Sequence, residues 1–212
     1  MIIAVDGPTA SGKGTIAKRL AAHFGVPHLD TGLLYRAVGR QVALNEGDPD
    51  NEAHALAGCA FPDELLENEA LRTEEVGGIA SRVSVHPAVR EALFKRQRAF
   101  AEQPGGAVLD GRDIGTIIAP DADVKLFITA SVQERARRRW LEMVSKHIGD
   151  EDEIPLSEIE KDVVARDARD INRADAPLKA APDAMVIDTT SFDREQAFET
   201  VLEAVQAALA QQ

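Results

Sequence analysis

The chain alternates short runs of apolar residues with longer segments in which apolar positions recur with helical spacing. The short runs predict strands near residues 2–5, 107–109, 124–128 and 185–187, with a weaker strand at 28–29. A helical pattern follows each run, and this alternation builds a parallel sheet covered on both faces. The pattern therefore predicts an α/β fold with a five-stranded parallel sheet flanked by helices.

Capping residues mark several expected helix starts. A first helix is expected over about residues 13–24. Residues 131–134 and 157–160 both have the capping-box spacing, in which a hydroxyl and a carboxylate satisfy free amide groups. Thr31 is expected to cap the second helix and Asp193 the last one.

Two stretches interrupt the alternation. Residues 45–72 are polar, acidic and rich in Gly and Pro, which predicts a small insertion or mobile subdomain. Residues 149–153 form a charge run, Gly-Asp-Glu-Asp-Glu, between two strong helical patterns. The composition of that run indicates a solvated turn, whereas its position suggests the hinge of a lid.

Composition narrows the class of protein. The 212 residues suffice for one sizeable core, and 44% hydrophobic with 28% charged residues is typical of a soluble globular protein. The net charge of −12 argues against a nucleic-acid polymer as partner, but not against a nucleotide. No apolar run is long enough for a membrane span, and the single Cys59, expected to be a buried apolar residue, fits a reducing compartment. We therefore expect a cytoplasmic protein.

A glycine-rich segment follows the first predicted strand. It reads Gly7-Pro8-Thr9-Ala10-Ser11-Gly12-Lys13-Gly14-Thr15. Such a turn lets backbone N–H groups approach a polyphosphate, and the following helix directs its positive end to the same place. The spacing and the strand-loop-helix context predict a phosphate-binding loop in which Lys13 reaches the outer phosphates. Gly14 stands where the general motif has Ser or Thr, so the Mg²⁺ contact of a hydroxyl moves to Thr15 or is lost.

Charged residues follow two other predicted strands. Arg36 lies one turn into the second helix, where it either packs structurally or clamps an anion at the carboxyl edge of the sheet. Asp110 and Asp113 flank Arg112 at the end of another strand. Asp110 could orient magnesium-bound water and Asp113 could accept hydrogen bonds from a base. A structural Arg–Asp pair is the alternative.

Arginines cluster on two later helices. Arg135, Arg138 and Arg139 share one helical face, and Arg137 points elsewhere. A second set has the same kind of spacing: Arg166, Asp170 and Arg173. A solvated, salt-bridged surface is the usual explanation. Phosphoryl transfer would use the same residues differently, because converging guanidinium groups stabilise the charge on the migrating group.

Together these residues resemble bacterial cytidylate kinases over nearly the whole chain. The matching motifs are Asp6-Gly7-Pro8, Gly12-Lys13-Gly14-Thr15, Asp30-Thr31-Gly32, Tyr35-Arg36, Val89-Arg90-Glu91, Asp110-Gly111-Arg112-Asp113, Glu134-Arg135, Arg166-Asp167 and Asn172-Arg173. The resemblance implies one P-loop kinase domain over residues 1–212, with a nucleotide-monophosphate-binding insert at about 31–103 and a lid at about 145–160. It also implies transfer of the γ-phosphate of ATP to CMP or dCMP with Mg²⁺, by a monomer without nucleic-acid or membrane partners. Familiar members carry a small β subdomain in the insert, and residues 45–72 look shorter than that subdomain.

The resemblance further implies a role for each matching position. The ATP phosphates would be held by Gly7, Pro8, Thr9, Ala10, Ser11, Gly12, Lys13, Gly14 and Thr15, and Arg135 would stack on adenine. The CMP side would be lined by Thr31, Arg36, Ser81, Arg90, Arg112, Asp113, Arg166, Asp170 and Arg173. The transferring phosphoryl group would be handled by Lys13, Arg112, Arg139, Arg166 and Arg173. No residue would bind Mg²⁺ directly, since the ion would be held through ATP and water near Thr15 and Asp110.

Three other functions are compatible with a phosphate loop. A kinase for UMP, AMP or another small acceptor would use a similar site. A GTP-binding switch is suggested by Asn172-Arg173-Ala174-Asp175, but Gly14 and the lack of any Asp-x-x-Gly argue against it. A nucleotide-binding regulator without catalysis would not need so many arginines.

Overall fold

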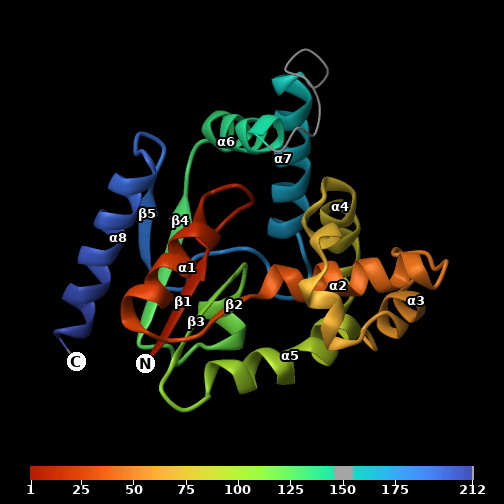
Figure 1. Ribbon diagram of the computed structural model, residues 1–212, viewed down its shortest axis with the longest axis horizontal. Coiled ribbons are helices and arrows are strands. Elements are labelled where there is room, and N and C mark those ends of the chain that lie inside the picture. The colour runs from red at the N-terminus through yellow and green to blue at the C-terminus, as the bar shows by residue number, and fades with distance from the viewer. Residues whose placement is uncertain (146–154, 212) are drawn as a thin grey trace.

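The computed structural model describes residues 1–145 and 155–211. At its centre is a parallel five-stranded sheet in the order β2-β3-β1-β4-β5 (Figure 1). The strands are β1 (Ile2–Asp6), β2 (His28–Asp30), β3 (Ala107–Gly111), β4 (Val124–Thr129) and β5 (Met185–Asp188). All neighbouring pairs are parallel, so the carboxyl ends of the strands share one edge. The predicted fold class and all five predicted strands are confirmed.

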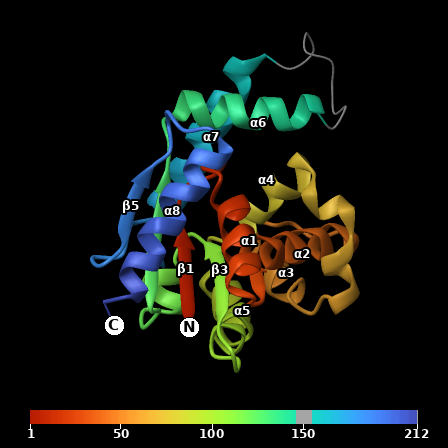
Figure 2. The ribbon, with the colours of Figure 1, turned by 60° about the vertical axis from the view of Figure 1, so that its left-hand side comes forward.

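Helices cover both faces of this sheet because the strand residues alternate. Ile3 and Val5 of β1 pack with α1 (Lys13–Phe24) and α8 (Arg194–Leu209) on one face. These two helices lie in front of the strands in Figure 2. Ala4 points to the other face, against α5 (Pro87–Ala101) and the single π-helical turn η3 (Ile114–Ile118).

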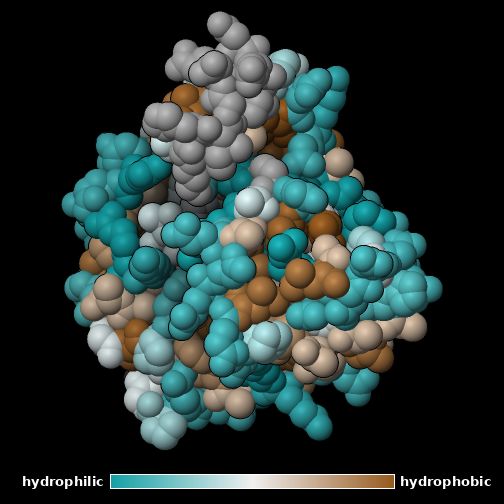
Figure 3. All heavy atoms as spheres, turned by 45° about the vertical axis from the view of Figure 1, so that its right-hand side comes forward, coloured by the Kyte–Doolittle hydropathy of each residue, from teal (hydrophilic) through white to brown (hydrophobic). Residues whose placement is uncertain are grey.

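The segment between β2 and β3 forms a helical insert with its own apolar core. Its elements are α2 (Thr31–Leu44), α3 (Glu52–Ala57), the 3₁₀ turns η1 (Asp63–Glu67) and η2 (Glu69–Arg72), and α4 (Glu74–Val83), followed by α5. Residues 45–72, predicted as an insertion, contain helical turns and no strand. Figure 3 views the molecule from this side and shows hydrophobic residues grouped among hydrophilic ones.

Helices α6 (Val132–Ser145) and α7 (Leu156–Ile171) stand above the carboxyl edge of the sheet (Figure 1). They pack on each other through Ala136, Ile159 and Val163. The predicted charge run at 149–153 lies outside the described residues, as does most of the predicted lid. No helix in the described ranges has both the length and the apolar character that a membrane crossing needs.

The predicted helix starts have mixed outcomes. Asp193 forms a complete capping box with Gln196, as its position predicted. The hydroxyl of Ser131 accepts from the Glu134 amide at 3.2 Å, but the Glu134 carboxylate binds arginines, so only half of that box forms.

Two further cap predictions are wrong. α7 begins at Leu156, which leaves Ser157 inside its first turn without a capping role. Asp30, not Thr31, is the N-cap residue of α2. The Thr31 hydroxyl is occupied elsewhere, because it donates to the Asp110 carbonyl of β3 at 2.8 Å.

Candidate active site

The phosphate loop runs from the end of β1 to the start of α1, as predicted. Three of its residues have positive φ: Gly7 (153°), Ala10 (56°) and Gly12 (87°). A Cβ atom on Gly7 would lie 2.1 Å from the Ile128 carbonyl oxygen of β4, so only glycine fits there. The loop therefore turns tightly over the carboxyl ends of two strands.

Lys13 occupies the centre of this loop. Its side chain is buried, and its ammonium group donates to the Pro8 carbonyl at 3.3 Å. Burial, and next the charge of Arg112, lower the pKa of Lys13 to about 8. Lys13 is therefore mostly protonated at neutral pH, although its pKa lies only a little above that pH.

Asp6 is a site residue that has no role in the interpretation of the sequence. Its two carboxylate oxygens accept the backbone N–H groups of Ile114 and Gly115, both at 2.8 Å. Burial raises its pKa to about 6. The only sequence signal was a carboxylate directly before Gly7 at a strand end. Through these bonds, Asp6 fastens the phosphate-loop strand to the segment that follows Asp113.

Acidic residues gather where β2 and β3 end. His28 Nε2 lies 2.7 Å from Asp110 Oδ1. A Cβ atom on Gly14 would lie 3.5 Å from Asp110 Oδ2, which places this carboxylate beside the phosphate loop. Burial, and next the charge of Asp110, raise the pKa of Asp30. A half-buried and a buried carboxylate, those of Asp30 and Asp110, thus share one corner of the site.

Two further aspartates of the site, Asp170 and Asp113, are ion-paired with arginines. Asp170 of α7 accepts from Arg112 Nε at 2.8 Å and also from Arg173. Burial raises the pKa of Asp170, but the two guanidinium groups outweigh it and the pKa is lowered. Asp113 pairs with Arg90, while burial raises its pKa. Arg112 and Asp113 are thus both ion-paired, but with partners outside their own segment and not with each other, and both line the cavity.

Arg36 reaches across the insert. Its Nη1 atom donates to the carbonyls of Leu71 at 2.7 Å and Thr73 at 2.9 Å. Burial, and next the charges of Arg166 and Arg139, lower the pKa of Arg36 to about 10. Several cations therefore face the same space, which favours an anionic ligand.

These groups line one cavity of about 640 Å³. The predicted residues that it brings together are Thr9, Ala10, Ser11, Gly12, Lys13, Gly14, Thr15, Thr31, Arg36, Ser81, Asp110, Arg112, Asp113, Arg139, Arg166, Asp170 and Arg173. Four predicted site residues do not line it: Gly7, Pro8, Arg90 and Arg135. Gly7 packs closely against the Ile128 carbonyl, and the Pro8 carbonyl accepts from Lys13. Arg90 acts on the site through its ion pair with Asp113.

Arg135 packs against the phosphate loop, and its contacts are with protein groups. It donates to the Thr9 carbonyl at 3.1 Å, to the Ala130 carbonyl at 2.9 Å, and to both carboxylate oxygens of Asp167. Only 5% of its side chain is exposed. Its stacking on adenine stays a prediction.

The residues around the loop suit a magnesium ion carried by a nucleotide. Within residues 1–145 and 155–211, no group of three or more His, Cys, Asp or Glu side chains is placed to hold a metal by itself. Asp30 and Asp110 nevertheless lie together at the cavity, and their mutual repulsion is the kind that a cation relieves. Oxygen ligands from these carboxylates, from Thr15 and from phosphates fit a hard cation.

A family model described as cytidylate kinase matches residues 3–207. The chain belongs to the cytidylate kinase family. Proteins named cytidylate kinase from Methylocella silvestris and Xanthobacter autotrophicus are both 51% identical to it, and each alignment covers 98% of this chain and at least 95% of the relative. The one from Granulibacter bethesdensis is 52% identical and covers 94% of this chain and 93% of that relative.

Membership of the cytidylate kinase family confirms the resemblance predicted from the motifs and does not favour the switch-protein or regulator alternatives. A solved structure of an uncharacterised protein from Eubacterium ventriosum superposes with a TM-score of 0.57 at 15% identity, covering 97% of this chain and 98% of that one. This second likeness concerns the fold alone.

Proposed function

We propose that the protein transfers the γ-phosphoryl group of ATP to CMP, yielding CDP and ADP. The observation that carries this proposal is the single cavity that joins a phosphate loop to a cluster of paired arginines and aspartates. A donor and an acceptor bound at its two sides would meet with their phosphates between Lys13 and the arginines. The family name supplies the acceptor.

The donor side is the phosphate loop. Backbone N–H groups of residues 7–15 would cradle the ATP phosphates, with Lys13 following the migrating group. We keep Arg135 as the residue proposed to stack on adenine. Mg²⁺, held through ATP and water near Thr15 and Asp110, would neutralise charge on the phosphates.

The acceptor side is formed by the carboxyl end of β3, the insert and α7. Asp113 and Asp170 would accept hydrogen bonds from the cytosine amino group and the ribose hydroxyls. The phosphate of CMP would be bound by basic and hydroxyl side chains: Thr31, Arg36, Ser81, Arg90, Arg112, Arg166 and Arg173. On the strength of the family resemblance, we propose that dCMP is also an acceptor.

The transfer itself would need no general base. The attacking oxygen of the CMP phosphate is already ionised, so catalysis consists of alignment and charge stabilisation. Arg112, Arg139, Arg166 and Arg173 would stabilise the charge that spreads over the migrating group. We propose that residues 31–103 and about 145–160 act as the acceptor-binding insert and the lid around this centre.

We also propose that the protein works in the cytoplasm as a monomer, on free nucleotides. A free Cys59, half-buried and with its pKa raised to about 11 by burial, suits a reducing compartment.

A coupled assay of ADP formation with ATP and Mg²⁺ tests the proposal, with CMP, dCMP, UMP, AMP or no acceptor. We expect ADP release to depend on CMP or dCMP. Release with AMP or UMP alone would contradict the acceptor, and acceptor-independent hydrolysis would contradict the reaction. Lys13→Ala serves as the control, with turnover lowered on the order of a hundredfold or more at an unchanged unfolding temperature.

A further inference from the structure

Two arginines of α6 hold the outward-facing carbonyls of the phosphate loop. Arg135 donates to the Thr9 carbonyl at 3.1 Å, and Arg138 donates to the Ser11 carbonyl at 3.2 Å. The residue between these two carbonyls is Ala10, whose φ of 56° is unfavourable for any residue with a side chain. The loop is thus fastened on both sides of its least favourable residue.

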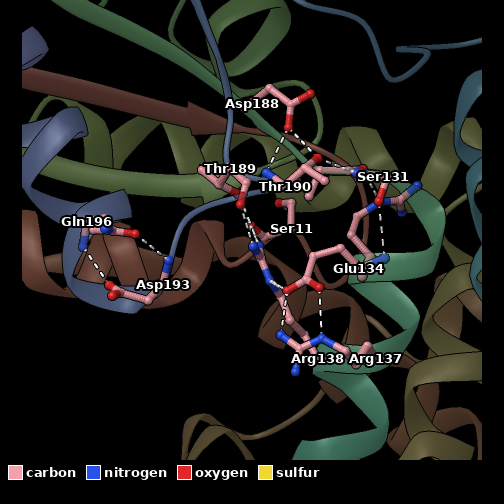
Figure 4. A network of polar contacts seen from close by, with 12 residues as sticks. Ser11, Ser131, Glu134, Arg137, Arg138, Asp188, Thr189, Thr190, Asp193 and Gln196 are labelled. Carbon is pink, nitrogen blue, oxygen red and sulfur yellow. Dashed lines mark hydrogen bonds and ion pairs between the residues drawn. The ribbon is translucent and has the colours of Figure 1, made fainter.

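Arg138 makes this contact as part of a network that joins three elements. Its Nη2 atom donates to the Thr189 carbonyl at 2.6 Å, and Nη1 donates to the Thr189 hydroxyl at 3.0 Å. Glu134 fixes the other edge of the guanidinium, accepting from Nε at 2.8 Å. Figure 4 shows Arg138 between Glu134, Thr189 and Ser11.

The far end of this network is rigid. Thr189 is fully buried, and both its backbone N–H and its hydroxyl donate to the Thr129 carbonyl of β4, at 2.9 Å and 3.0 Å. Arg138 therefore ties the Ser11 carbonyl to the ends of β4 and β5.

Peptide geometry links that outward contact to the inside of the loop. In a planar trans peptide, the C=O of one residue and the N–H of the next point in opposite directions. Holding the Ser11 carbonyl outward toward Arg138 therefore turns the Gly12 N–H inward, to the side where successive amides can bind an anion. Gly12 has a φ of 87° and no Cβ atom, so this peptide has little else to restrain its rotation.

We propose that Arg138 is a positioning residue that keeps the phosphate loop in its anion-binding form by fixing the Ser11–Gly12 peptide. The residue acts through the loop and has no contact with the nucleotide. This inference rests on the proposed function, because it assumes that ATP phosphates occupy the loop. It predicts a defect confined to the donor nucleotide.

Arg138→Ala and Arg138→Lys test the proposal, with Arg137→Ala as matched control. Arg137 neighbours Arg138 on α6 and binds the same Glu134 at 2.8 Å, but it is 55% exposed and touches no loop carbonyl. The lysine variant keeps the positive charge but cannot donate to the Ser11 and Thr189 carbonyls as a fork. Equilibrium binding of ATP and, separately, of CMP is measured by calorimetry, alongside the two KM values and the unfolding temperature.

We expect both Arg138 variants to bind ATP about tenfold more weakly, the effect of one lost hydrogen bond to a charged group, with CMP binding unchanged. Arg137→Ala should bind both nucleotides normally. Normal ATP binding by Arg138→Ala, full recovery in Arg138→Lys, or an equal loss for both nucleotides would each overturn the proposal. If the alanine variant does not fold, the lysine variant decides. A wild-type protein that binds ATP but does not phosphorylate CMP would contradict the proposed function instead.

Discussion

Opposing charges set the protonation of Lys13. Burial and Arg112 lower its pKa, whereas Asp110, Asp30 and Asp170 raise it, and the net value is about 8. The ammonium group therefore depends on the carboxylates at the ends of β2, β3 and α7. If Lys13 binds phosphate as proposed, a pKa so close to neutral pH should make catalysis sensitive to mildly alkaline pH.

We expect kcat/KM for ATP to fall as the pH rises through about 8. The lowered pKa means that the free enzyme carries the ammonium charge below this pH and loses it above. Rates measured from about pH 6 to about pH 10 at saturating CMP would show this limb. Lys13→Arg, which stays charged, should lack the limb at a lower overall rate. A wild-type profile that is flat across the range would contradict the assignment.

Asp6 should make stability depend on pH in the opposite direction from a salt-bridged carboxylate. Its pKa rises from 3.8 to about 6 on folding, so the folded protein holds the proton more tightly. The stability that this group contributes is therefore complete below pH 3.8 and is lost as the pH rises through about 6.

Asp6→Asn, which does not ionise, isolates this effect. Between about pH 4 and pH 8, we expect the free energy of unfolding of the wild type to fall by roughly 2.5 kcal/mol relative to the variant. Denaturant titrations at several pH values measure the difference. A constant difference between the two proteins would show that Asp6 keeps an ordinary pKa in the fold.

Helix α4 contains adjacent glycines that differ in their surroundings. A Cβ atom on Gly77 would lie 2.8 Å from Nη2 of Arg36, whereas a Cβ atom on Gly78 would meet nothing within 4 Å. Glycine is unfavourable in a helix, so its presence at position 77 indicates that the Arg36 guanidinium needs the space over the backbone. The lack of a side chain at Gly77 thus makes room for the Arg36 guanidinium.

Gly77→Ala should raise KM for CMP about tenfold by displacing Arg36, while KM for ATP stays constant. Gly78→Ala is the matched control, because it makes the same change one position along the helix. It should leave both KM values unchanged and stabilise the protein by up to about 1 kcal/mol. Equal effects of the two substitutions on CMP would argue against a specific role for Gly77.

Elements whose signals are local were predictable. The strand runs, the helix after the phosphate loop and the Asp193 cap each depend on residues close in sequence, and the structure has them. The start predicted at Ser157 was wrong because Pro155 is the N-cap residue of α7, two residues earlier. Helix α2 of the insert was expected from its place after a strand. Helices α3 and α4 were not foreseen, since the core of the insert comes from packing between distant segments.

The site shows the same division. The loop from Gly7 to Thr15 is contiguous, so its place between β1 and α1 could be predicted from spacing alone. The bonds of Asp6 to residues 108 and 109 positions away, and of Arg138 to a loop carbonyl 127 positions away, exist only once the sheet has formed. No pattern in the chain marks such partners.

Across the whole molecule, separate apolar cores underlie the parts of the site. One core joins the sheet to α1 and α8, another holds the insert together, and a small one joins α6 to α7. The cavity lies where these three parts meet, and each contributes charged groups to it. A site assembled in this way can change its width when the parts shift, without breaking any one core.

The arrangement also concentrates positive charge on an acidic protein. The chain has a net charge of −12, yet Lys13 and several arginines converge on one cavity. We expect so acidic a chain to repel polyanions such as nucleic acids, and the cations of the cavity to favour a small phosphate ester. That the protein has no nucleic-acid partner stays a prediction from composition.

The pairing of Arg112 and Arg173 with Asp170 has a consequence for selectivity in a living cell. Both cations are already neutralised before any ligand arrives, so a bare anion gains little by competing with a buried carboxylate for them. A nucleotide can give Asp170 new hydrogen-bond donors at the same moment as it takes the arginines. We therefore expect the enzyme to keep working in the presence of abundant inorganic phosphate, which could otherwise occupy and poison a site so rich in arginine.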